Sequence, residues 1–140
     1  MAPKLAQISA RGVAVRNAAA KCYQNVADQG DADARHVLGV MCREGQSAPQ
    51  DYAPAARWYL RSADQGNVRA QHDLGIAYYL GDGVRTDYVQ ALKWLNLAVV
   101  IANDPDFRLK VAGNINLLTS KMTPAQRAEA QRLASEWRKT

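Results

Sequence analysis

Residues 63–94 read ADQGNVRAQHDLGIAYYLGDGVRTDYVQALKW, and residues 27–58 read ADQGDADARHVLGVMCREGQSAPQDYAPAARW. The two stretches overlay without a gap at an offset of 36 residues. Extending them to 27–62 and 63–98 gives 13 identical positions in 36. The identities fall at small, apolar and helix-capping residues alike. A fixed period of this length is typical of repeat proteins, in which each unit packs on its neighbours.

Each copy predicts two helices joined by a loop. The first helix spans about 33–44 in one copy and 69–80 in the other, with Gly39 and Gly75 near its centre. A glycine inside a helix costs about 1 kcal/mol relative to alanine, so its recurrence predicts the close approach of a neighbouring helix. Candidate N-caps precede all four helices of the two copies: Asp31, Asp51, Asn67 and Asp87.

The second copy contains Ala70-Gln-His-Asp-Leu-Gly-Ile-Ala-Tyr78, Gly81-Asp-Gly-Val84 and Ala91-Leu-Lys-Trp94. This pattern resembles the Sel1-like repeat, a relative of the tetratricopeptide repeat. The first copy departs from it where Cys42 replaces the usual tyrosine and Ser47-Ala48 replace the usual Gly-Val. The resemblance implies an all-α fold, a short right-handed αα-solenoid of helix pairs.

The whole chain, residues 1–140, is expected to form one domain of six or seven helices without a sheet. Its predicted parts are an N-terminal helix or degenerate repeat (1–30), repeat 1 (31–66), repeat 2 (67–103) and a C-terminal helical cap (104–140). The cap should contain helices near 106–119 and 124–138. Thr123-Pro124-Ala125-Gln126 is a helix-start signal, with an N-cap, a proline at the first helical position and a capping-box glutamine.

Charge is distributed unevenly along the chain. The net charge of +5 divides into +3 for residues 1–30, −2 for 31–105 and +4 for 106–140. Nucleic-acid binding usually needs basic residues clustered with stacking aromatics. We therefore interpret the basic residues at the two ends as parts of solvated helix faces. The alternative is a nucleic-acid-associated protein that uses its basic termini.

Motifs for catalysis or metal binding are absent from the sequence. It has no nucleophile elbow, no phosphate loop and no dinucleotide fingerprint. His36 and His72 occupy the same repeat position and are expected about one helix spacing apart, too far to share a zinc ion. Cys22 and Cys42 are expected to be packed, reduced thiols. We expect no enzyme activity, no cofactor and no metal.

The location of the protein is also an expectation from sequence. No run approaches the ~18 apolar residues of a membrane span, and the first ten residues contain no signal-peptide core. The sequence predicts a cytoplasmic protein with no membrane association. A periplasmic location is the alternative if a leader precedes this sequence.

The first helices of the two copies provide the candidate binding surface. With Leu38 directed at the second helix and an advance of ~100° per residue, one face of each first helix points away from the pair. In tetratricopeptide-like proteins these positions line a concave groove that holds a partner segment. The expected partner-binding residues are Asp33, His36, Val37, Val40, Arg43, Glu44, Arg69, His72, Asp73, Ile76, Tyr79 and Leu80.

The resemblance therefore implies a non-catalytic protein–protein interaction module that binds a peptide or helix of another protein. Two alternatives concern the groove and the assembly. Some of the groove residues could pack against the neighbouring first helix instead of facing a partner. The chain could also be a homo-oligomeric structural unit, since two full repeats are fewer than the three or so that a solenoid usually needs.

Overall fold

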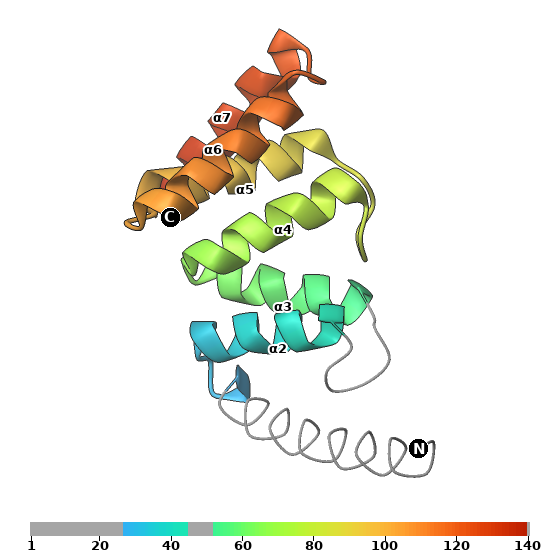
Figure 1. Ribbon diagram of the computed structural model, residues 1–140, viewed down its shortest axis with the longest axis vertical. Helices are drawn as coiled ribbons and strands as arrows, with labels where there is room; N and C mark the ends of the chain where they lie inside the picture. Colours follow the sequence, from blue (N-terminus) through green and yellow to red (C-terminus); the bar gives the residue numbers. More distant parts are fainter. Residues whose placement is uncertain (1–26, 45–51, 140) are drawn as a thin grey trace, which may run out of the picture.

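The computed structural model describes residues 27–44 and 52–139, and these ranges contain six α-helices and no strand (Figure 1). The helices stack one on the next along the long axis of the molecule (Figure 1). The expected all-α solenoid is confirmed for this part of the chain. The helices are α2 (Ala32–Glu44), α3 (Tyr52–Asp64), α4 (Val68–Leu80), α5 (Tyr88–Ile101), α6 (Pro105–Thr119) and α7 (Pro124–Lys139).

Predictions for several segments fall outside this part of the chain. They concern the degenerate repeat before residue 27, the N-cap Asp51 and the thiols of Cys22 and Cys42. Within the described ranges, no helix is long and apolar enough to cross a membrane.

The helices begin at the capping residues that the sequence indicates. Asp31, Asn67 and Asp87 each accept a hydrogen bond from the backbone N–H three residues later, at 2.9, 2.8 and 3.1 Å. Thr123 and Gln126 form a reciprocal capping box, with each side chain accepting from the other residue's backbone N–H. These bonds satisfy N–H groups that have no partner inside the helix.

The two helices of each repeat cross closely at a glycine. A Cβ atom added to Gly39 would lie 3.2 Å from the carbonyl oxygen of Ala55, and one added to Gly75 would lie 3.1 Å from that of Ala91. Ala55 and Ala91 are themselves 36 residues apart, so both repeats use the same glycine–alanine crossing. This confirms the close approach that the recurring glycine predicts.

The two repeat tryptophans lie in different surroundings. Trp94 of α5 is only 1% exposed, and its ring centroid lies 5.9 Å from that of Trp137 in α7. Trp58 of α3 is half-buried, with the Arg61 guanidinium carbon 5.0 Å from its ring centroid. The difference arises because α7 packs on α5 and covers the tryptophan of the second repeat.

The last helix separates a packed face from a solvated one. Ala130 and Ala134 of α7 are fully buried, and Leu133 and Trp137 are half-buried. The pattern predicts burial at Ala130, Leu133 and Trp137; Ala134 is an additional core residue. On the outer face, exposed Arg132 pairs with Glu129 and Glu136. An apolar face against α5 and a charged face outside are what a terminal cap requires.

Candidate functional site: a groove with two cavities

Two adjoining cavities share a wall on α4, and we call the surface that contains them the groove. The first, the acidic cavity, has a volume of about 120 Å³ and lies where α3 meets α4. The second, the apolar cavity, has a volume of about 220 Å³ and lies between α4 and α6 above α5. The acidic cavity is lined by residues that include Tyr59, Asp73, Ile76, Leu80 and Asp82. The apolar cavity is lined by Ile76, Tyr79, Leu80, Leu95, Asn114, Leu117 and Leu118.

The two cavities are related by the repeat. Tyr59 lines the first cavity and Leu95 the second, and these residues stand 36 positions apart in α3 and α5. Ile76 and Leu80 line both cavities, so they form the wall between them. The same geometric site therefore recurs along the solenoid with different side chains.

The predicted groove residues divide into three groups. Asp73, Ile76, Tyr79 and Leu80 line the cavities. The side chains of Arg43 and Glu44, in the last turn of α2, lie outside the described part of the chain. The remaining residues lie elsewhere on α2 and α4: Asp33, His36, Val37, Val40, Arg69 and His72.

Most of this last group contacts neighbouring elements. Asp33 accepts a hydrogen bond from the Asn67 side chain at 2.7 Å. The guanidinium carbon of Arg69 lies 4.9 Å from the ring centroid of Phe107. Val37 and Val40 are half-buried against apolar core clusters. For these side chains the structure gives packing between helices.

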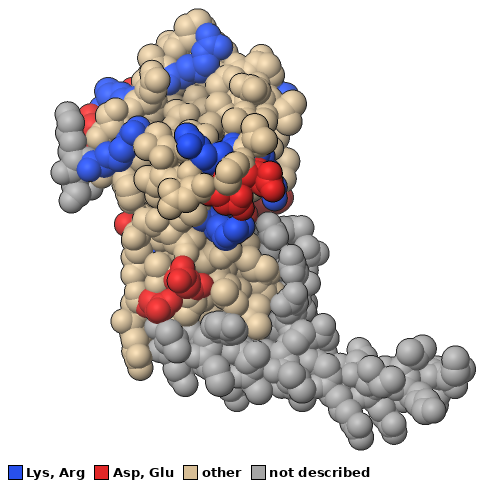
Figure 2. Space-filling model, turned by 60° about the vertical axis from the view of Figure 1, so that its left-hand side comes forward, with Lys and Arg blue, Asp and Glu red and all other residues tan. Residues whose placement is uncertain are grey.

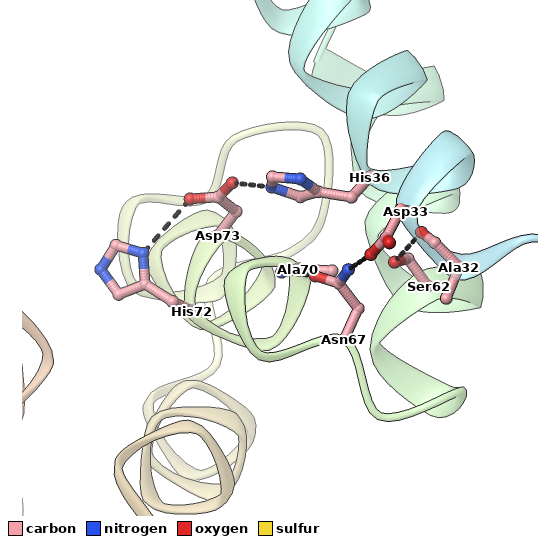
Figure 3. A network of polar contacts seen from close by, with 8 residues as sticks. All are labelled: Ala32, Asp33, His36, Ser62, Asn67, Ala70, His72 and Asp73. Carbon is pink, nitrogen blue, oxygen red and sulfur yellow. Dashed lines mark hydrogen bonds and ion pairs between the residues drawn. The ribbon is translucent and has the colours of Figure 1, made fainter. Parts of the chain in front are cut away.

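A chain of hydrogen bonds joins the three first helices, and Figure 3 shows the part of it on α2 and α4. Nε2 of His36 in α2 lies 2.8 Å from Oδ2 of Asp73 in α4, and Nδ1 of His72 lies 3.2 Å from Oδ1 of the same carboxylate. On the other side, Nδ2 of Asn114 in α6 lies 2.9 Å from Nε2 of His72. With this amide orientation, His72 donates through Nδ1 and accepts through Nε2. His72 is only 4% exposed, so its ring is part of the helix packing.

Asp73 is the charged residue at the middle of this series of hydrogen bonds. Burial alone would raise the pKa of the carboxyl group. The hydrogen bonds from His36 and His72, together with their charge interactions, outweigh burial and hold the pKa of Asp73 well below its usual range. Asp73 is therefore an ionised carboxylate at neutral pH, with each oxygen bound to one imidazole.

This shift predicts a loss of stability in acid. An Asp whose pKa is lower in the folded protein than in the unfolded chain stabilises the fold above the unfolded pKa, near 3.8, and loses that contribution as the pH falls further. Urea denaturation between pH 7 and pH 2.5 should show this loss for the wild-type protein and a shallower loss for Asp73→Asn. Asp64→Asn, which removes an exposed carboxylate, is the control. Equal acid dependence of the wild type and Asp73→Asn would contradict the prediction.

The rim of the apolar cavity carries a cation. Nζ of Lys121 donates to the hydroxyl group of Tyr79 at 2.7 Å and lies 5.1 Å from the ring centroid of that residue. The hydrogen bond with Tyr79 raises the pKa of Lys121. Tyr79 also stacks on Tyr88, with 5.7 Å between ring centroids. Its ring is thus fixed from two sides, which gives the cavity a preformed wall.

The sequence pattern missed the residues that α6 and the second helices contribute to the groove. Leu117 is 63% exposed and lines the apolar cavity with Asn114, and Leu95 lines its floor. A signal for them was available, since Asn67 and Asp104 are both N-caps and α6 can be aligned as a third first helix. In that alignment Leu117 takes the position of Leu80.

Other kinds of site find little support in the described ranges. No group of three His, Cys, Asp or Glu side chains there could hold a metal ion. On the face in Figure 2, Lys and Arg side chains are scattered and stand beside Asp and Glu, without forming a continuous stripe. On that face, the mixed charges are typical of solvated helix faces.

The stacked helix pairs define an αα-solenoid repeat protein. Residues 32–67 and 68–99 each match the family model of the Sel1 repeat, so this part of the chain consists of two Sel1 repeats. No curated protein matches the sequence.

The solved structures that are similar to this chain include the following two proteins. One is a protective antigen present in uropathogenic Escherichia coli strains, which displays an SLR fold. It has a TM-score of 0.78 and 31% identity over 86% of this chain and 25% of that one. The other is a Sel1 repeat protein from Oxalobacter formigenes, with a TM-score of 0.63 and 33% identity over 69% of this chain and 26% of that one. The chain spans about a quarter of the length of either protein. Sel1-repeat proteins in general are non-catalytic scaffolds for protein–protein interaction.

Proposed function

We propose that this chain is a non-catalytic interaction module that binds a peptide or helix of another protein in the groove. The observation that carries the proposal is the pair of adjoining cavities with exposed leucines at their edge. Leu80 and Leu117 are 56% and 63% exposed, and both line the apolar cavity. Large apolar side chains around a hollow are typical of a binding surface.

The rigidity of the surroundings supports the same function. Apart from Asp82 in the loop after α4, the cavity walls are α-helices, and the chain of hydrogen bonds through Asp73 joins α2, α4 and α6. A preformed groove loses little conformational entropy when a partner binds, so more of the contact energy appears as affinity.

The test compares two variants that carry equal charge. Leu80→Glu/Leu117→Glu places two carboxylates at the groove, whereas Leu109→Glu/Val100→Glu places two at exposed leucine and valine side chains outside the cavities. In parallel pull-downs, the proteins that bind the wild type and the control but not the groove variant would be identified by mass spectrometry. Each would then be purified and titrated against all three proteins.

We expect the groove variant to bind such a partner at least tenfold more weakly, because two apolar contacts are replaced by charges that must be desolvated. Circular dichroism must show both variants folded. Partners that bind the groove variant and the control equally well would refute groove binding.

A further inference from the structure

We propose that the segment bound in the groove presents a basic side chain to the acidic cavity and a large apolar side chain to the apolar cavity, about 10 Å apart. This inference rests on the proposed function and specifies the chemistry of the partner. It follows from the different lining of two cavities that occupy equivalent places in successive repeats.

The acidic cavity offers two carboxylates and no Lys or Arg among its described lining residues. Asp73 lies on its α4 side, with both oxygens bound to imidazoles. Asp82 follows Gly81, the left-handed cap of α4, and its carboxylate has no hydrogen-bond or ion-pair partner among the described residues. A Lys or Arg side chain entering this cavity would meet the Asp82 carboxylate, which has no partner among the described residues, whereas an acidic side chain would be repelled.

The apolar cavity accepts a different group, because each of its two polar side chains already forms a hydrogen bond. The Tyr79 hydroxyl accepts from Lys121, and the Asn114 side-chain amide donates to His72. The remaining lining side chains are aliphatic. An engineered apolar cavity of about 150 Å³ is large enough to bind benzene, so 220 Å³ accommodates the end of a leucine, methionine or phenylalanine side chain.

The spacing between the two groups follows from the shared wall. Ile76 and Leu80 separate the cavities, so the cavity centres are about one helix-packing distance apart, roughly 8–10 Å. Residues i and i+3 of a polyproline II segment lie ~9 Å apart on one side of the chain. Residues i and i+7 of an α-helix lie ~10 Å apart on one face. Either backbone can present the two side chains together.

The test uses a phage-displayed library of random dodecapeptides selected on the 140-residue protein. We expect enriched sequences to contain Lys or Arg at one of these two spacings from Leu, Met or Phe. An enriched peptide is then synthesised with three changes: basic residue to Gln, apolar residue to Ser, and both. The affinities of the parent and changed peptides for the protein variants Asp82→Asn and Leu117→Gln are measured by fluorescence polarisation. The control proteins are Asp64→Asn on α3 and Leu109→Gln on α6, both exposed positions outside the cavities.

Two losses of affinity are expected, each paired with one peptide residue. Asp82→Asn should weaken the parent peptide about threefold to tenfold and leave the Gln peptide unchanged. Leu117→Gln should weaken the parent peptide about tenfold and the Ser peptide much less. The control proteins should bind as the wild type does.

The outcomes separate this inference from the proposed function. The proposed partner chemistry is wrong if Leu117→Gln loses affinity but the enriched sequences lack a basic residue. It is also wrong if Asp82→Asn weakens the parent and Gln peptides equally. In both cases groove binding stands. If no peptide is enriched, or neither groove variant differs from its control, groove binding and this inference are both wrong.

Discussion

Trp94→Ala should lower the free energy of unfolding by about 3–5 kcal/mol, the loss typical of a large buried aromatic residue. Trp94 is almost fully buried among residues of α3, α4, α5 and α7. Its removal leaves a cavity at the junction of both repeats and the cap, and the edge contact with Trp137 is lost with it. Urea denaturation followed by circular dichroism measures the change directly.

Two further variants show whether burial is the cause. Trp58→Ala removes the equivalent side chain of the first repeat, which is half-buried, and should cost about 1 kcal/mol. Trp94→Phe keeps an aromatic ring and removes an indole N–H that is buried without a hydrogen bond among the described residues. It should therefore cost much less than alanine. Equal losses of unfolding free energy for Trp58→Ala and Trp94→Ala would contradict the conclusion that burial by α7 makes Trp94 the more important of the two tryptophans.

Gly75→Ala should destabilise the protein by about 1–2 kcal/mol, although alanine is the better helix former. The added Cβ would lie 2.9 Å from Cγ of Leu95 and 3.1 Å from the carbonyl oxygen of Ala91. The leucine side chain can shift, but the carbonyl belongs to α5 and can move only with that helix. Overpacking of this kind costs about 1–3 kcal/mol, which outweighs a gain in helix propensity of up to ~1 kcal/mol.

Gly113→Ala is the matched control, with the opposite sign expected. Gly113 lies within α6, and no described atom lies within 4 Å of the position that its Cβ would take. Alanine there should raise the free energy of unfolding by about 0.5–1 kcal/mol. Both changes can be measured by the same urea titration. A stabilising Gly75→Ala would contradict the close crossing of α4 and α5.

Local features of the fold were predictable because they repeat. The paired glycines occur in both repeats, and Asn67 and Asp87 follow known helix-start patterns. The sequence therefore indicates these features without tertiary information. The burial of Trp94 was less accessible, because it depends on α7 packing back onto α5 across some 40 intervening residues. A repeat comparison treats Trp58 and Trp94 as equal, whereas their surroundings are different.

The groove was predictable in part. Helical periodicity placed Ile76, Tyr79 and Leu80 on one face of α4, and all three line a cavity. Periodicity alone did not separate His72, which is covered by α6, from Leu80, which is exposed. That distinction depends on which neighbouring helix overlaps each position. Leu117 belongs to α6, which is the first helix of a third pair, and Asp82 belongs to the loop after α4. Both lie outside the helix face that the repeat alignment defines.

The hydrogen bonds from His36 through Asp73 and His72 to Asn114 have a mechanical consequence. They act as a tie between α2, α4 and α6. Bending that widens the groove stretches donor–acceptor distances near 3 Å, and hydrogen bonds weaken steeply when lengthened or misaligned. The resistance of the solenoid to opening should therefore depend on these three side-chain hydrogen bonds.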